Sequence, residues 1–159
     1  MNASNLIRII PDFPKPGIIF KDITPLLANA EAFGEVCNQI AEHATDVEYI
    51  AGVEARGFIF AAAVAAISNK GLIPIRKSGK LPGKTFSNSY DLEYGKATLE
   101  IHSDLIPTGG TAVAAIDLIK MAGLSPKTIA FLLEIPALGG RSRIAKSHPG
   151  LKIQTILAE

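Results

Sequence analysis

Residues 104–112 combine hydroxyl groups, two glycines and the start of an apolar helical pattern in the stretch Asp-Leu-Ile-Pro-Thr-Gly-Gly-Thr-Ala. Gly109 and Gly110 allow successive backbone N–H groups to point into one concavity, and a helix that begins there adds the positive end of its dipole. Thr108 and Thr111 supply hydroxyl donors beside them. The pattern is typical of a phosphate-binding loop, and a glycine cap of a helix without a ligand is the alternative interpretation.

Cationic side chains at two other places could bind an anionic group. Arg56 follows an expected strand and precedes an expected helix, at the edge where open parallel sheets bind ligands. Its planar fork suits a pyrophosphate, and a surface ion pair with Glu54 is the alternative. Arg76, Lys77 and Lys80 form a basic stretch that could hold a leaving pyrophosphate or could be a solvated face.

The composition indicates one globular domain over residues 1–159, because 48% of the residues are hydrophobic and only 19% are charged. The formal net charge of +1 without a long basic run disfavours a nucleic-acid partner. Cys37 is the single cysteine, which fits a buried core position and a reducing cytoplasmic location. The first ten residues do not resemble a signal peptide. The longest apolar run, 58–67, is too short to cross a membrane and predicts a buried helix.

Hydrophobic periodicity predicts strands that alternate with helices. We expect strands at 49–53, 72–75, 128–134 and 152–157, and helices at 29–44, 58–68, 110–122 and 139–146. Asn29 is the expected N-cap of the first of these helices. This alternation predicts an α/β fold with a mostly parallel central sheet that is flanked by helices.

Residues 76–101 differ from this pattern. A basic, glycine-rich stretch is followed by residues that alternate between apolar and polar. We expect a long antiparallel hairpin that projects from the sheet, with residues 81–83 near its tip.

Together these pieces resemble the adenine phosphoribosyltransferases of the type I phosphoribosyltransferase fold. The matching stretches follow the order of the family and cover nearly the whole chain: 11–27 (Pro-Asp-Phe-Pro-Lys-Pro-Gly-Ile-Ile-Phe-Lys-Asp-Ile-Thr-Pro-Leu-Leu), 54–58 (Glu-Ala-Arg-Gly-Phe), 74–83, 92–97 and 107–111. The resemblance implies transfer of phosphoribose from 5-phosphoribosyl 1-pyrophosphate to adenine, which gives AMP and pyrophosphate. It also implies Mg²⁺ bound mainly through the substrate pyrophosphate, a homodimer, an N-terminal hood segment over 1–27 and a lid hairpin over 76–101.

The same resemblance implies roles for individual residues. The base would lie on the Phe20 ring, with the backbone of Ile19 and Lys21 at its edge and Leu138 against its other face; the alternative for Phe20 is an apolar anchor of its loop. The predicted pyrophosphate-binding residues are Arg56, Arg76, Lys77 and Lys80, and the predicted ribose 5-phosphate site comprises Asp104, Thr108, Gly109, Gly110, Thr111 and Ala112.

Glu93 and Tyr94, on the returning arm of the hairpin, would act at the reacting centre. Glu93 is the candidate general acid–base for the purine ring nitrogens, and Tyr94 would close over them. The alternative for Glu93 is an exposed strand residue.

The chain departs from the family pattern just before the phosphate loop. In the family, a continuous apolar strand that ends in two adjacent acids precedes this loop, whereas here only Asp104 stands before Leu105. About a dozen residues, one strand and the turn that leads into it, are missing from the pattern. A central strand buries about five apolar side chains at ~1.5–3 kcal/mol each, on the order of the whole net stability of a domain. The sequence therefore predicts a rearranged or weakened sheet, or a segment that this sequence omits.

Three other functions remain open at this stage. The chain could transfer phosphoribose to another purine, namely hypoxanthine, guanine or xanthine. It could be a non-catalytic regulator that binds phosphoribosyl pyrophosphate, or an inactive truncated form of the enzyme. The 11–27 stretch favours adenine over the other purines.

Overall fold

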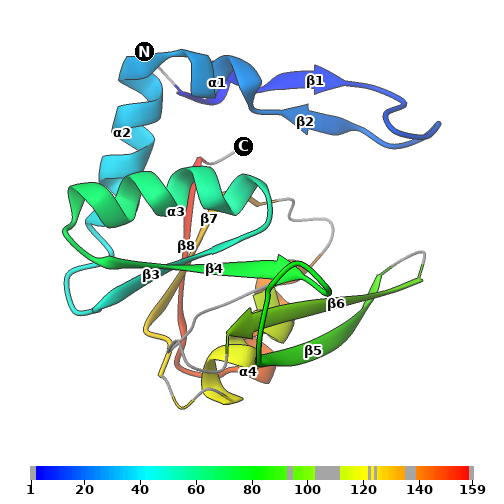
Figure 1. The fold of residues 1–159 in the computed structure, drawn as a ribbon. Helices are drawn as coiled ribbons and strands as arrows, with labels where there is room; N and C mark the ends of the chain where they lie inside the picture. Colours follow the sequence, from blue (N-terminus) through cyan, green and yellow to red (C-terminus); the bar gives the residue numbers. More distant parts are fainter. Residues whose placement is uncertain are drawn as a thin grey trace.

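The computed structural model describes residues 3–92, 95–102, 112–121, 123, 125–134 and 139–157 (Figure 1). The N-terminal part consists of a short 3₁₀ helix η1 (Ala3–Leu6), strands β1 (Arg8–Ile10) and β2 (Phe20–Asp22), and helices α1 (Thr24–Ala28) and α2 (Ala30–Ala41). The rest contains β3 (Tyr49–Val53), α3 (Arg56–Ile67), β4 (Gly71–Lys77), β5 (Thr85–Leu92), β6 (Gly95–His102), α4 (Ala112–Met121), β7 (Thr128–Leu133), α5 (Gly140–Ser147) and β8 (Lys152–Leu157).

Strands β3 and β4 form a parallel pair that is connected by α3. Their register places Tyr49 opposite Gly71 and Val53 opposite Ile75, so both strands end at the same edge. Gly52 permits α3 to approach β3 closely, because a Cβ at this position would lie 2.7 Å from the carbonyl oxygen of Gly57. Any larger residue would push the first turn of α3 away from the strand.

The antiparallel hairpin is present, but its turn is at the other end from the one expected. Strands β5 and β6 pair from Thr85 opposite His102 to Leu92 opposite Gly95, so the hairpin turns between 92 and 95. Residues 81–83 instead lie in the connection from β4 to β5, next to the point where Lys77 pairs with Leu99. The basic, proline-containing stretch suggests the turn of a hairpin because it interrupts regular structure. The position of the turn is instead set by which residues of the two strands pair with each other.

The second parallel pair, β7 and β8, is not bonded to the first. The observed strand orders are β3-β4-β6-β5 and β7-β8, with β1-β2 as a separate antiparallel pair. The α/β class is confirmed, but among the described residues no strand joins β3 to β7, and the parallel strands occur as two pairs.

Helices cover both faces of the larger sheet (Figure 1). On one face, α2 and α3 pack into a cluster that includes Val36, Phe60 and Val64 and extends to Leu157 of β8. On the other face, Leu118 of α4 packs against β4 and β6. The molecule thus has three layers, as expected for an α/β fold.

Most predicted element boundaries agree with the structure to within about three residues. Asn29 caps α2 as expected, since its side chain accepts a hydrogen bond of 2.9 Å from the N–H of Ala32. Cys37 is buried in the core, and this burial raises the pKa of its thiol.

The apolar run 58–67, which was expected to be a buried helix, is only partly buried in the single chain, since Ile59 is 42% and Ile67 54% exposed. No helix in the described parts of the chain is long and apolar enough to cross a membrane.

Asp22 anchors the hairpin of β1 and β2, which we call the hood, to the rest of the chain. Its Oδ1 accepts hydrogen bonds from the Thr24 backbone N–H at 2.9 Å and the Thr24 hydroxyl at 2.6 Å, and its Oδ2 accepts one from Arg8 Nε at 3.0 Å. These hydrogen bonds from Thr24 and Arg8 lower the pKa of Asp22 to about 2. Asp22 therefore links β1, β2 and the first turn of α1.

The lowered pKa of Asp22 predicts a specific acid sensitivity. Its contribution to stability is present above the unfolded pKa of about 3.9 and is lost as the pH falls towards about 2. We expect the thermal unfolding midpoint of the wild type to fall over this range, and Asp22→Asn to show a lower midpoint at neutral pH and a shallower decline in acid. Circular dichroism melts measure both. Asp46→Asn, at an exposed carboxylate, is the control, and equal acid slopes for wild type and Asp22→Asn would contradict the role of Asp22.

Candidate functional site

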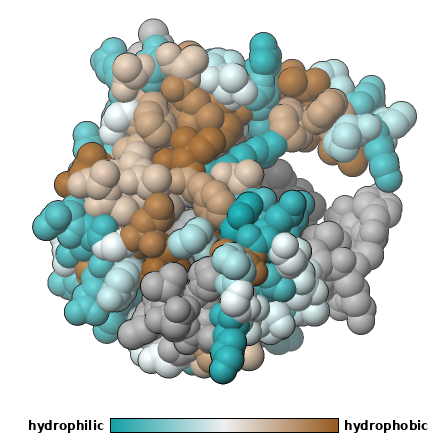
Figure 2. Space-filling view, in the orientation of Figure 1, coloured by the Kyte–Doolittle hydropathy of each residue, from teal (hydrophilic) through white to brown (hydrophobic). Residues whose placement is uncertain are grey.

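The candidate site lies where β3 and β4 end, below the hood. Arg56 begins α3 directly after β3, and Arg76 and Lys77 are the last residues of β4. The space-filling view is hollowed beneath the hood, on the side that these strand ends face (Figure 2). Open α/β sheets bind ligands at this carboxyl edge.

Phe20 and Arg56 lie in direct contact. The guanidinium carbon of Arg56 lies 4.5 Å from the centre of the Phe20 ring, a cation–π arrangement. The ring of Phe13 meets Phe20 edge-on, with 5.0 Å between ring centres. Two residues that are 36 positions apart in the sequence, one predicted for the base and one for the pyrophosphate, are thus brought together by the fold.

Phe13 was not predicted as a site residue. It lies in the 11–17 loop, and its place beside Phe20 follows from the turn of the hood. An aromatic residue in a proline-rich loop is a signal for a binding residue. The sequence, however, does not show that the Phe13 ring lies against Phe20.

Strand β2 has a partner strand along one of its edges. β1 pairs with β2 from Arg8 opposite Asp22 to Ile10 opposite Phe20, and no second strand pairs with β2 in the described structure. Ile19, which precedes β2, is 65% exposed. The contacts of a base edge with the backbone of Ile19 and Lys21 remain a prediction.

Glu54 holds the charged end of β4. Its carboxylate accepts hydrogen bonds from Arg76 Nε at 3.3 Å, from Arg76 Nη2 at 3.4 Å and from the Lys77 backbone N–H at 3.2 Å. These hydrogen bonds, from the Arg76 side chain first, lower the pKa of Glu54, and the charge of nearby Lys80 adds to the effect. The expected alternative, an ion pair between Glu54 and Arg56, is not formed, because Glu54 pairs with Arg76.

The turn after β4 is also fixed. Arg76 Nη1 donates to the Lys80 carbonyl at 3.1 Å. Glu100 of β6 accepts hydrogen bonds from the Ser78 hydroxyl at 2.7 Å and the Gly79 backbone N–H at 2.9 Å. Lys80 therefore lies on a turn that is tied to the neighbouring strand, and Arg76 and Lys77 end the strand that leads into this turn.

A second ion-pair network lies where β7 ends. Glu134 accepts hydrogen bonds from Arg141 of α5, the shortest from Nη2 at 2.7 Å, and from the Thr155 hydroxyl at 2.9 Å. Arg141 also donates to the Ile153 carbonyl. The hydrogen bonds from Arg141 lower the pKa of Glu134. The network joins β7, α5 and β8 on either side of residues 135–138.

Several predicted site residues lie outside the described residues. These are Glu93, Tyr94, Asp104, Thr108, Gly109, Gly110, Thr111 and Leu138. Ala112 is the first residue of α4, as a phosphate loop that runs into a helix requires. The roles of this set stay predictions.

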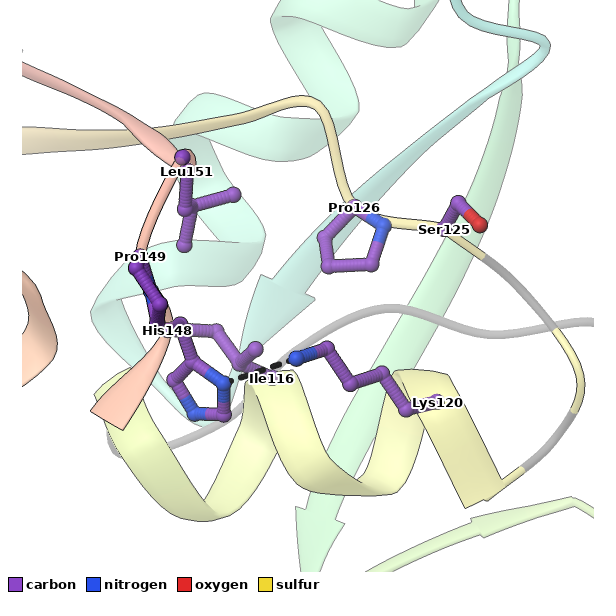
Figure 3. A pocket seen from close by; sticks show the side chains of 8 residues that line it. Ile116, Lys120, Ser125, Pro126, His148, Pro149 and Leu151 are labelled. Carbon is purple, nitrogen blue, oxygen red and sulfur yellow. Dashed lines mark hydrogen bonds between the residues drawn. The ribbon is translucent and has the colours of Figure 1, made fainter.

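A cavity of about 260 Å³ lies at a different place, beside the C-terminal half of α4 and before β7 and β8 (Figure 3). The ring of His148 borders it and is nearly buried, with Nδ1 2.8 Å from Lys120 Nζ and Nε2 3.4 Å from Asp117. None of its lining residues belongs to the predicted site. The cavity is therefore separate from the cluster around Phe20 and Glu54.

Comparisons with known proteins identify close relatives. The chain is 44% identical to an adenine phosphoribosyltransferase of Streptomyces coelicolor, over 95% of this chain and 91% of the relative. The crystal structure of an adenine phosphoribosyltransferase from Rhodothermus marinus matches with a TM-score of 0.89 and 37% identity, over 99% and 96% of the two chains. The enzyme from Giardia lamblia, complexed with 9-deazaadenine, matches with a TM-score of 0.89 and 32% identity, over 100% and 98%. No protein-family model matches the chain.

The alignment with the Streptomyces coelicolor relative also bears on the predicted missing strand. It extends over 166 residues, more than the 159 residues of this chain, so the relative has residues without a counterpart here. In the structure, β3 and β7 each lack a strand partner on one edge within the described residues. Their sequences are almost wholly apolar, which is typical of central strands, but most of their residues are only half-buried. We infer that the absent residues include a strand between β3 and β7.

A chimera tests this inference. Inserting between Asp104 and Leu105 the residues that the Streptomyces coelicolor relative has and this chain lacks should raise the free energy of unfolding by about 5 kcal/mol, because apolar surface on β3 and β7 becomes covered. Urea unfolding measures the change. An insertion of equal length made of glycine and serine is the control and should not stabilise. If both insertions have the same effect, the missing residues do not form a central strand.

Proposed function

Because this chain belongs to the adenine phosphoribosyltransferase family, we propose that the hood holds adenine and that the ends of β3 and β4 hold the pyrophosphate of the cosubstrate. The chain is a purine-salvage transferase, which forms AMP and pyrophosphate from adenine and 5-phosphoribosyl 1-pyrophosphate. The contact of Phe20 with Arg56 carries the assignment, since it joins a platform for a flat base to a cation for the leaving group. We propose one domain over 1–159, with 1–27 as its N-terminal hood segment, which contains the hairpin of β1 and β2, and 76–101 as its lid.

The base would bind on the ring of Phe20. The half-buried ring contacts Phe13 in a T-shaped arrangement, and Arg56 covers one face. When Arg56 turns towards an anionic group, this face becomes free for a purine. Leu138 would close the opposite side of the base. The complex of the Giardia lamblia relative with 9-deazaadenine supports an adenine-like ligand.

The pyrophosphate would bind to Arg56, Arg76, Lys77 and Lys80. These residues lie at the ends of two adjacent parallel strands and on the turn that follows, so their charges converge on one edge. Thr108–Ala112 would bind the ribose 5-phosphate with backbone N–H groups, and Asp104 would contact a ribose hydroxyl.

Mg²⁺ would arrive with the substrate. The described residues contain no group of three or more acidic, histidine or cysteine side chains that could hold a metal ion. Glu54, an acid at the predicted pyrophosphate site, is already hydrogen-bonded to Arg76. A donor set of this kind fits an ion bound mainly through pyrophosphate oxygens, where it would neutralise charge on the leaving group.

The protein would accelerate the reaction mainly by orientation and charge. The cations would stabilise the departing pyrophosphate while positive charge develops at the anomeric carbon of the ribose. Glu93 would exchange a proton with a ring nitrogen of the purine, and Tyr94 would cover the reacting atoms. The hairpin of β5 and β6 would exclude water, so that adenine rather than water accepts the phosphoribosyl group.

Formation of AMP tests this function directly. We expect the purified chain with Mg²⁺ to make AMP from adenine and 5-phosphoribosyl 1-pyrophosphate and to prefer adenine over hypoxanthine, guanine and xanthine in competition. Glu93→Gln should lower kcat by about 10²-fold and leave adenine binding almost unchanged, because general acid–base catalysis contributes this much. Chromatographic assay of AMP gives both values.

Four results would contradict parts of this proposal. A preference for another purine would reassign the base. Binding of phosphoribosyl pyrophosphate without turnover would favour the non-catalytic regulator. If this chain makes no AMP but the chimera with the inserted strand does, the chain is an inactive shortened form of the enzyme. An active Glu93→Gln variant would remove the role of Glu93.

We also propose that the chain works as a homodimer in the cytoplasm. The exposed face of α3 carries Ile59, Ala62, Ala66 and Ile67 and has no charged residue after Arg56. Figure 2 shows apolar residues gathered over this helix. An apolar helix face of this kind favours a protein interface, and a second copy is the occupant that the family implies.

Sedimentation tests the dimer. We expect the wild type to sediment as a dimer at micromolar concentration and Ile67→Lys to shift it towards monomer, because a buried lysine in an apolar interface has no partner. Met121→Lys is the matched control, since Met121 is equally exposed but lies on α4. An unchanged dimer in Ile67→Lys would exclude this face as the interface.

A further inference from the structure

The candidate pyrophosphate site contains one acidic side chain, Glu54, where a set of cations is expected. An acid beside an anion site usually weakens binding of the anion by charge repulsion. Here, however, Glu54 is the first residue after β3, and its side chain is largely covered, with 19% of its surface exposed. Its position and its contacts therefore need another explanation.

The contacts of Glu54 determine which edge of Arg76 faces outwards. Glu54 engages Nε and Nη2, the side edge of the guanidinium, at 3.3 and 3.4 Å. The Lys80 carbonyl takes one N–H of Nη1 at 3.1 Å. A guanidinium has five N–H donors in one plane, so these contacts leave one N–H of Nη1 and one N–H of Nη2. The remaining N–H of Nη2 points to the far end of the guanidinium, an edge at which arginine can bind phosphate oxygens.

The same carboxylate also fixes the backbone next to Arg76. It accepts the N–H of Lys77 at 3.2 Å, so the last residue of β4 is tied to the residue that follows β3. Parallel register brings the two into reach, because Val53 lies opposite Ile75. One carboxylate thus contacts both the Arg76 side chain and the backbone of Lys77.

We propose that Glu54 is a positioning residue for the leaving group, and that it orients Arg76 and Lys77 so that their donors meet the pyrophosphate. This inference rests on the proposed function, in which Arg76 and Lys77 bind pyrophosphate. Glu54 itself does not touch the substrate. Its negative charge is offset by Arg76 and by Lys80, so its net repulsion of an incoming anion is small.

Direct binding of inorganic pyrophosphate in the presence of Mg²⁺ tests the proposal without turnover. Glu54→Gln keeps the size of the side chain but removes the charge and one acceptor, and we expect the Kd of pyrophosphate to rise about tenfold. In the AMP assay, KM for phosphoribosyl pyrophosphate should rise by a similar factor while KM for adenine stays the same. Titration calorimetry and initial rates measure these values. Glu35→Gln, at an exposed acid of α2, is the control and should match the wild type.

Glu54→Asp provides the second variant. It keeps the charge but shortens the reach, so we expect pyrophosphate affinity between those of the wild type and Glu54→Gln. If Glu54→Gln does not fold, as judged by circular dichroism, weaker pyrophosphate binding by Glu54→Asp with unchanged KM for adenine supports the proposal.

Each other outcome contradicts it. Equal pyrophosphate affinity in wild type and Glu54→Gln, or Glu54→Asp where that variant replaces it, would show that Glu54 does not position the cations. Tighter binding would show that its charge repels the anion. Equal weakening of pyrophosphate and adenine would show a general structural role. A wild type that binds no pyrophosphate would overturn the proposed function together with this inference, whereas the first three outcomes leave that function intact.

Discussion

The parallel pairing of β3 with β4 is the constraint on which the candidate site depends. Because Val53 lies opposite Ile75, the residues that follow β3 and the last residues of β4 emerge at the same edge. Glu54 can therefore reach both Arg76 and the Lys77 backbone, and Arg56 begins α3 beside them. The close approach of α3 at Gly52 holds the first turn of that helix over the strand. A shift of one residue in this register would separate the cations from the acid that orients them.

The hood adds an aromatic surface to this charged edge. It is a small two-stranded element that is joined to the body by the contacts of Asp22 with Thr24 and by the stacking of Arg56 on Phe20. A hairpin of this size is marginally stable by itself, so these attachments decide where Phe20 lies. Arg56 has two potential partners, an aromatic face and an anion. It thus couples the part of the site that favours a flat base to the part that favours phosphate.

The two separate parallel pairs are the main departure from an undivided sheet. β3 and β7 have sequences of the kind that parallel sheets bury on both faces, yet each has one edge without a strand partner among the described residues. A shared apolar cluster, which includes Phe60 of α3 and Leu157 of β8, still connects the halves. The hydrophobic core therefore connects the halves where backbone pairing between described strands does not.

Local sequence determined most of the elements and the family. Asn29 predicted the start of a helix because an N-cap acts within three residues. The predicted bounds of β3 and β8 agree with the structure because the spacing of apolar residues is a local signal. The five motifs that indicated adenine phosphoribosyltransferases are also local. The turn of the β5–β6 hairpin was misplaced, because the ladder is set by pairing between strands.

Only the tertiary structure decided which of these pieces meet. In the structure, the guanidinium of Arg56 lies over the Phe20 ring, and the carboxylate of Glu54 pairs with Arg76 instead of Arg56. The ring of Phe13 lies against Phe20, which is the ring proposed to bind the base. An ion pair or a ring contact depends on strand register and on the path of the chain between residues far apart. The sequence shows which side chains are available. Only packing of the whole chain sets the distances between them, and these distances decide which two side chains form a contact.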